Sequence, residues 1–244
     1  MADWNDPQST RTGFGGGPAL NGQVLGADTR DQGLRRYMLS IYNYMASGVL
    51  LSGVVALLFV MSGMAAQVFN TPLRWVIALA PLAFIFFFSP RRDEGTLKVM
   101  FWAFCAVMGL SLSAILLIYT GPSIATTFFA TAASFAGLSL YGYTTKRNLS
   151  AMGSFMMMGL IGIIIAMLLN IWLQSSGLAM AISILGVLIF AGLTAWDTQR
   201  LRDTYYQVAG SDMAGKAVIL GALTLYLDFV NMFQFLLQFL GDRR

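Results

Sequence analysis

The chain has 244 residues, of which 57% are hydrophobic and 11% charged, and its formal net charge is +4. Soluble domains carry about 25% charged residues, so this composition indicates an integral membrane protein. The chain has no histidine and one cysteine, Cys105, which excludes Ser-His-Asp catalysis, histidine-bound zinc and an intrachain disulfide. The basic residues are scattered between apolar runs, which is typical of topology signals. We therefore expect no enzyme activity, no cofactor and no nucleic-acid partner.

The first 35 residues differ in composition from the remainder. Residues 1–35 are rich in Gly, Asn, Asp, Thr and Gln and lack apolar periodicity, which predicts a disordered N-terminal tail. They also lack the charged and then apolar pattern of a cleaved signal peptide, so the first membrane span would serve as the insertion signal. Residues 36–244 are predicted to form one transmembrane domain.

From about residue 38 onward, long apolar runs alternate with short polar breaks. A bilayer core of about 30 Å needs about 20 helical residues per crossing, and the chain accommodates seven such spans. The predicted spans are 38–63, 72–89, 98–119, 122–144, 151–173, 177–198 and 217–240. The predicted fold class is thus an all-α integral membrane protein with seven transmembrane helices. Pro81 falls inside the second span, where it removes a backbone donor and predicts a kink.

The positions of Lys and Arg predict the orientation, because cytoplasmic loops are enriched in both. If the N-terminus is cytoplasmic, every basic residue faces the cytoplasm except Arg74, Arg243 and Arg244. Seven crossings then place the C-terminus outside. The alternative is a last segment that re-enters the membrane and returns to the cytoplasm.

One acidic residue, Asp228, lies inside the last span, in LTLYLDFVNMFQFLLQFL. Gly221, Thr224, Asp228 and Asn231 recur every three or four residues and form one stripe of the helix. Lipid cannot satisfy polar groups, so this stripe is expected to face the bundle or a water-filled cavity. An ionisable residue at this depth is a functional-site hypothesis, with Thr224 and Asn231 as pore or supporting residues. The alternative is a neutral structural carboxylic acid bonded to a neighbouring helix.

A second acidic residue, Asp197, lies at the predicted cytoplasmic end of the sixth span, in GLTAWDTQRLR. A carboxylate there faces the negative end of the helix dipole and needs a compensating partner, for which Arg200 and Arg202 are near in sequence. Taken alone, Asp197 is either an interfacial charge or a site residue. Arg91 and Arg92, in FFFSPRRDEG, are interpreted first as positive-inside anchors.

The segments GLTAWDTQRLR and ALTLYLDFVNMFQFLLQFLG, preceded by YGYTTKRNLSAMGSFMMMGLIG, resemble the bacterial members of the transmembrane Bax-inhibitor-motif family. The resemblance extends from Asp31 to the C-terminus. It implies a last helix that runs through the centre of the other six, and a pH-sensitive calcium leak channel of the bacterial inner membrane. The two aspartates that sense pH and gate that pathway fall on Asp197 and Asp228. The arginine that latches them falls on Arg91, or on Arg92 after a one-residue slip.

The chemistry of such a pair is consistent with that role. Two carboxylates held close share one proton and titrate in two separated steps, so the pair can act as a pH switch. Ionised, Asp197 and Asp228 would offer hard oxygen ligands to Ca²⁺, but this ion takes six to eight oxygens and the binding is expected to be weak. We expect calcium ions and protons to be the partners, in a lipid bilayer.

The predicted spans leave one geometric problem. Asp228 lies about 11 residues, or roughly 16 Å, into its span, whereas Asp197 lies near the cytoplasmic edge. Either the last helix begins below the membrane surface or Asp197 lies deeper than predicted.

Other functions use the same features. Some bacterial relatives modulate a membrane-embedded AAA protease, so the resemblance also allows a regulatory protein that binds such a protease through its N-terminal tail. Buried acids also serve proton-coupled transporters. A membrane hydrolase is disfavoured because no nucleophile has a credible base.

Overall fold

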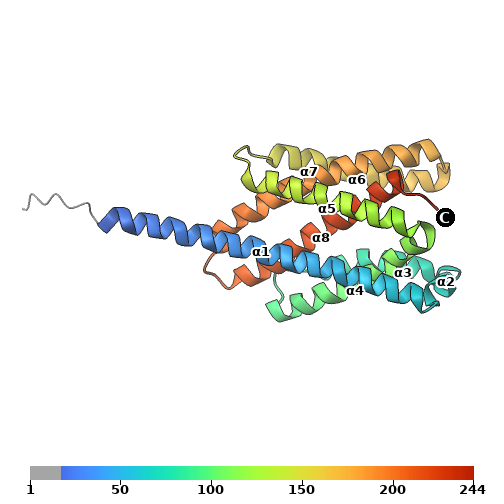
Figure 1. Ribbon diagram of the computed structural model, residues 1–244, viewed down its shortest axis with the longest axis horizontal. Helices are drawn as coiled ribbons and strands as arrows, with labels where there is room; N and C mark the ends of the chain where they lie inside the picture. Colours follow the sequence, from blue (N-terminus) through green and yellow to red (C-terminus); the bar gives the residue numbers. More distant parts are fainter. Residues whose placement is uncertain (1–17) are drawn as a thin grey trace, which may run out of the picture. The chain divides into compact units, whose positions relative to one another are not determined.

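The computed structural model describes residues 18–244, with side chains from residue 31 onward (Figure 1). The chain divides into two compact units, Met1–Arg36 and Tyr37–Arg244. The described elements are all helices, and the predicted all-α class is confirmed for this part of the chain. They are α1 (Pro18–Met61), α2 (Met64–Phe69), α3 (Leu73–Ile85), α4 (Glu94–Ile118), α5 (Gly121–Thr144), α6 (Ser150–Leu173), α7 (Ser176–Val208) and α8 (Met213–Leu240).

The N-terminal tail was predicted to be disordered over residues 1–35. Residues 1–17 lie outside the described part of the chain. The structure has α1 beginning at Pro18, within the predicted tail. Proline suits the first position of a helix, and a helix that already exists extends by one hydrogen bond for each residue added, so α1 includes residues that precede its apolar part.

Six described helices are long and apolar enough to cross a membrane. The predicted second span, 72–89, is shorter than expected, because α3 has 13 residues and a length of about 20 Å against a core of about 30 Å. It contains Pro81 and ends in tight turns, in which the amides of Phe87 and Phe88 donate to the carbonyls of Phe84 and Ile85. The short helix α2 was not predicted.

The last two long helices extend further than the sequence predicted. α7 runs to Val208 instead of 198, and α8 begins at Met213 instead of 217. The polar segment after Asp197 contains arginine, leucine and glutamine, which favour helix, so the helix continues beyond the apolar run. It stops before Gly210, whose φ of 77° lies in the left-handed region that glycine adopts without strain.

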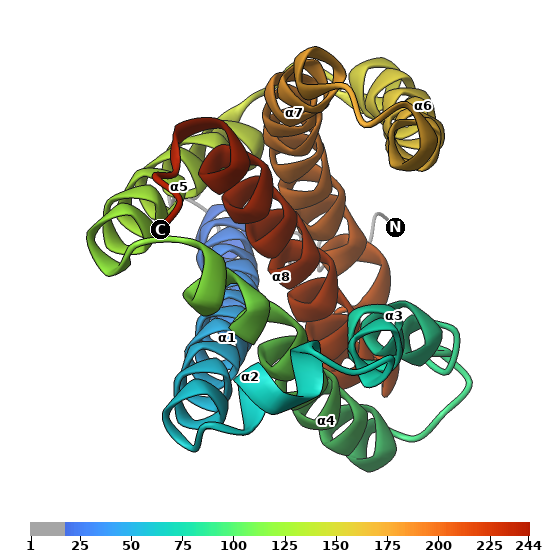
Figure 2. The ribbon, with the colours of Figure 1, turned by 90° about the vertical axis from the view of Figure 1, so that its right-hand side faces the viewer.

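α8 is the most buried of the candidate spans. It packs against α7, α5 and α4, and 50% of its most apolar stretch is buried. Figure 2 shows α8 running between these neighbours. α6 contacts chiefly α7, and only 6% of its apolar stretch is buried. Most of the apolar surface of α6 therefore faces outward, which suits contact with lipid.

The connections within Tyr37–Arg244 separate into two ends (Figure 1). The α3–α4, α5–α6 and α7–α8 connections lie at one end, whereas the α4–α5 and α6–α7 connections and the C-terminus lie at the other. The loops at the first end carry Arg91, Arg92, Lys146 and Arg147. The C-terminus, at the other end, carries Asp242, Arg243 and Arg244.

Candidate functional site

Asp197 on α7 and Asp228 on α8 meet inside the helical domain. Their exposed fractions are 6% and 4%, and the two carboxyl groups lie within hydrogen-bonding reach of each other. In the part of the chain that the structure describes, the buried Oδ2 of Asp228 has no hydrogen-bond partner. A carboxyl–carboxyl hydrogen bond exists only when one partner carries a proton, because an ionised carboxylate only accepts. A hydrogen bond between these two carboxyl groups would therefore require one proton.

The lengths of α7 and α8 explain how the carboxyl groups meet. α7 continues about 11 residues, or roughly 16 Å, beyond Asp197. α8 begins about 15 residues, or roughly 22 Å, before Asp228. Asp197 is thus well inside its helix, although it lies near the end of the apolar run. Both helices extend beyond the predicted span ends, and this brings the two residues to the same level.

Among the described residues, Arg200 is the cation that forms an ion pair with Asp197. Its Nη1 lies 3.8 Å from Oδ1 of Asp197, and its side chain is 64% exposed. The guanidinium also lies 5.5 Å from the centre of the Trp196 ring. An ion pair at this distance and exposure contributes little to stability.

Arg91 and Arg92 lie on the exposed loop between α3 and α4. Nε of Arg92 donates to the carbonyl of Phe87 at 3.2 Å. Among the described residues, neither arginine forms an ion pair with Asp197 or Asp228. The latch role of Arg91 therefore stays a prediction.

Thr224 and Asn231 are half-buried on α8, one turn to either side of Asp228. Oγ1 of Thr224 donates to the carbonyl of Leu220 at 3.1 Å, and Nδ2 of Asn231 donates to that of Leu227 at 2.8 Å. Both side chains thus bond to the backbone of their own helix. Their predicted roles in a pore remain predictions.

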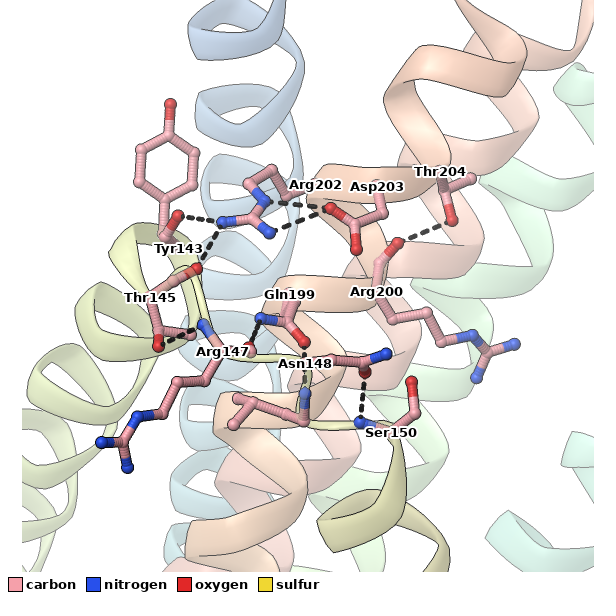
Figure 3. A network of polar contacts seen from close by, with 11 residues as sticks. Tyr143, Thr145, Arg147, Asn148, Ser150, Gln199, Arg200, Arg202, Asp203 and Thr204 are labelled. Atoms are coloured by element: carbon pink, nitrogen blue, oxygen red, sulfur yellow. Dashed lines mark hydrogen bonds and ion pairs between the residues drawn. The ribbon is translucent and has the colours of Figure 1, made fainter.

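Two residues of the GLTAWDTQRLR segment have contacts that the sequence analysis did not anticipate (Figure 3). Gln199, with an exposed fraction of 5%, bonds to the backbone at Leu149 and Arg147. Arg202 donates to the carbonyls of Tyr143 and Thr145. A polar helix end is usually solvated, so the sequence contained no signal that these side chains are turned inward.

A second buried polar cluster joins α1, α4 and α8. Oη of Tyr226 lies 2.6 Å from Oγ of Ser52. Oγ of Ser52 lies 2.7 Å from the carbonyl oxygen of Cys105 and 3.0 Å from that of Gly48. This cluster holds α8 two residues from Asp228. Sequence reasoning missed it because one serine in an apolar run has no periodic pattern.

The carboxyl pair offers an incomplete set of ligands for a cation. No group of three or more His, Cys, Asp or Glu side chains suited to a metal occurs within the described residues. Two carboxylates supply only part of the six to eight oxygens that Ca²⁺ takes. A cation at this pair would retain several water ligands and be bound weakly.

The fold and the site together define a class: an all-α, multi-pass membrane protein with a buried pair of acidic side chains on two adjoining helices. A family model described as "Inhibitor of apoptosis-promoting Bax1" matches residues 34–244. The chain belongs to this family, and the predicted resemblance is confirmed.

Bacterial relatives match most of the chain. An uncharacterized protein of Rickettsia prowazekii is 48% identical over 221 residues, which cover 88% of this chain and 93% of that protein. An uncharacterized protein of Caulobacter vibrioides is 48% identical over 230 residues, covering 88% and 91%. The inner membrane protein YbhL of Escherichia coli K12 is 43% identical over 219 residues, covering 87% and 94%.

Proposed function

We propose that this protein is a pH-sensitive calcium leak channel of the bacterial inner membrane, with Asp197 and Asp228 as its sensor and gate. The observation that carries the proposal is the contact between two buried carboxyl groups from different helices. With one shared proton, the pair forms a hydrogen bond that joins α7 to α8. Without that proton, two negative charges lie close together in a medium of low dielectric constant and repel each other.

Loss of the shared proton would favour an open state for two reasons. Repulsion between the carboxylates drives α8 away from α7, and the same charges attract a cation into the space between them. Because the two carboxylates are hard ligands but few, Ca²⁺ would bind weakly and leave readily, as permeation requires. The ionised pair would thus be both an open gate and a transient cation site.

α8 is the proposed moving and central element. Its contacts with α4, α5 and α7 and its high buried fraction support this role. A shift of α8 would change the packing on several sides at once, so a change of charge at Asp228 would be felt across the bundle. Arg91, on an exposed loop, is the proposed latch for the closed form.

The proposed orientation has the N-terminus in the cytoplasm and seven crossings, with α3 as a short crossing. The basic loops gathered at one end support this orientation, because cytoplasmic loops are rich in Lys and Arg. The name of the relative YbhL, an inner membrane protein, supports the proposed location.

The test is Ca²⁺ flux into liposomes that contain the purified protein, measured near pH 6 and near pH 8. The wild type is compared with Asp228→Asn and Asp197→Asn, which preserve side-chain size but cannot ionise. We expect flux to rise from pH 6 to pH 8 in the wild type and to vary little with pH in both variants.

Two results would contradict the proposal. If Ca²⁺ flux through Asp228→Asn depends on pH as it does in the wild type, the two aspartates are not the gate. No flux above empty liposomes at either pH would favour the alternative role, regulation of a membrane-embedded AAA protease, and would leave Asp228 as a structural acid. Gln207, exposed on α7, supplies a control variant, Gln207→Ala, that should behave as the wild type.

A further inference from the structure

The turn of α7 that follows Asp197 caps both helices of the α5–α6 hairpin (Figure 3). Nη1 of Arg202 donates to the carbonyls of Tyr143, at 2.7 Å, and Thr145, at 3.1 Å. These carbonyls lie at the C-terminal end of α5, where a helix has acceptors without intrahelical partners. A guanidinium at that end also compensates the negative end of the helix dipole.

Gln199 binds the loop that leads into α6. Its Oε1 accepts from the amide of Leu149 at 2.8 Å, and its Nε2 donates to the carbonyl of Arg147 at 2.7 Å. Leu149 is the residue before the first turn of α6, where amides have no intrahelical acceptor. Because Gln199 is buried, removing its side chain would leave both backbone groups short of a partner.

Residues 195–198 of α7 also contact α5 and α6 directly. Oγ1 of Thr198 lies 3.2 Å from Oγ of Ser139 on α5. A Cβ at Gly142 of α5 would overlap the carbonyl of Ala195, and a Cβ at Gly153 of α6 would overlap the Trp196 ring. The segment of α7 that carries Asp197 is therefore packed closely against α5 and α6.

We call the bonds of Gln199 and Arg202 to the α5–α6 hairpin the clamp. The groups around Asp197 show whether anything else attaches it to this hairpin. The charged or titratable groups that face Asp197 are Asp228 from α8 and Arg200 from its own helix. α5 contributes the Ser139 hydroxyl beside Thr198, and α1 contributes the Tyr42 hydroxyl, which reaches both. None of these groups ties Asp197 to the α5–α6 loop. That connection is made through Gln199 and Arg202.

We propose that Gln199 and Arg202 are positioning residues that join α5, α6 and α7 into one body, hold Asp197 in register with Asp228, and leave α8 as the moving side of the gate. This inference rests on the proposed function for its consequence, but the clamp itself can be measured separately. Neither residue touches the permeant ion in this scheme, since both act through the position of the Asp197 carboxyl.

The experiment uses the full-length protein in lipid nanodiscs and five variants. Gln199→Leu and Arg202→Met remove the clamp bonds with little change of volume. Arg202→Lys keeps a cationic donor, and Gln207→Ala alters an exposed glutamine of the same helix. The rate of amide hydrogen exchange in residues 145–149 measures how firmly Gln199 and Arg202 hold the α5–α6 loop. Infrared titration of the carboxylic-acid C=O band, with Asp228→Asn to assign it, reports the coupling of the pair.

We expect Gln199→Leu and Arg202→Met to speed exchange of the loop and to bring the two proton-loss steps closer together by about half a pH unit or more, a shift of the order of one hydrogen bond. Arg202→Lys should restore most of the protection, and Gln207→Ala should change neither measurement. If Gln199→Leu does not fold, Arg202→Met and Arg202→Lys make the same comparison.

Other outcomes overturn the inference. Faster loop exchange with an unchanged infrared titration would mean that the clamp only stabilises the loop, and unchanged exchange would mean that these side chains do not clamp it. Because neither readout needs ion flux, the two proposals fail separately. Changes in exchange and titration without any flux would retain the clamp and remove the channel. Wild-type flux that depends on pH, with exchange unchanged in Gln199→Leu, would retain the channel and remove the clamp.

Discussion

Asp228 shows how a single buried atom restricts the chemistry of a site. In the described part of the chain, its Oδ2 has no hydrogen-bond partner, and the neighbouring Asp197 carboxyl could donate to it only when protonated. An unsatisfied buried oxygen is unfavourable, so protonation of one carboxyl group would favour the contact between the two helices. In the proposed sensor, the closed and open forms would be two protonation states of this pair.

At the same scale, the Tyr226–Ser52 contact predicts that Ser52→Ala reduces stability more than Tyr226→Phe does. Ser52→Ala would leave the fully buried Tyr226 hydroxyl without its partner and cost about 1–3 kcal/mol. Tyr226→Phe removes the hydroxyl itself, while Ser52 keeps its bond to the Cys105 carbonyl, so it should cost only about 0.5–1.5 kcal/mol.

Unfolding in detergent, followed by fluorescence, measures both losses. Tyr206→Phe is the matched control because Tyr206 is exposed, and it should leave the unfolding transition unchanged. A larger loss for Tyr226→Phe than for Ser52→Ala would contradict the assignment of Ser52 as the bridging hydroxyl.

At the scale of elements, the close approach of α6 to α7 depends on Gly153. A Cβ at Gly153 would overlap the Trp196 ring, which is next to Asp197. α6 has few other contacts, since its neighbour is chiefly α7. The helix–helix distance at this point is therefore determined by glycine, as is common where membrane helices approach closely.

Gly153→Ala should consequently destabilise the protein by about 1–3 kcal/mol, the usual cost of overpacking. Gly162→Ala, on the same helix, is the matched control because nothing lies within 4 Å of the added Cβ. It should be neutral or slightly stabilising, since alanine favours helix by about 1 kcal/mol over glycine. Thermal unfolding of the two variants beside the wild type measures the difference, and equal effects would contradict close packing at Gly153.

At the scale of the whole molecule, the C-terminal residues are tied to the connection between α4 and α5. The amide of Thr120 donates to the carbonyl of Asp242 at 3.1 Å, and that of Arg244 donates to Ile118 at 2.9 Å. The guanidinium of Arg243 lies 5.9 Å from the centre of the Tyr119 ring. The end of α8 is thereby attached to α4 and α5, so the proposed movement of α8 would pivot near its C-terminal end.

The proposed orientation predicts which introduced cysteines an impermeant thiol reagent reaches from outside the cell. Thr71→Cys and Ser176→Cys should react in intact cells. Pro90→Cys and Ser211→Cys should react only after permeabilisation. All four positions are exposed, and the native Cys105 is buried, so its background labelling should be low. Labelling of Thr71→Cys and Pro90→Cys from the same side would mean that α3 is not a crossing and would leave six.

The sequence by itself determined the class of protein, the helical fold and the identity of the two acidic residues. Long apolar runs can be satisfied in lipid only as helices, and an aspartate in such a run is conspicuous without any structure. It did not determine where helices end in polar sequence, which is why α7 was predicted to stop at 198 and Asp197 to lie at an edge.

Only the tertiary structure decided which side chains meet. The contact of Asp197 with Asp228, the bonds of Gln199 to the α5–α6 loop, and the Tyr226–Ser52 cluster all join residues far apart in the chain. Such contacts depend on the rotation and depth of each helix, which follow from packing against several neighbours at once. Because no periodicity along a single helix encodes these positions, the sequence identified the charged groups and the structure identified their partners.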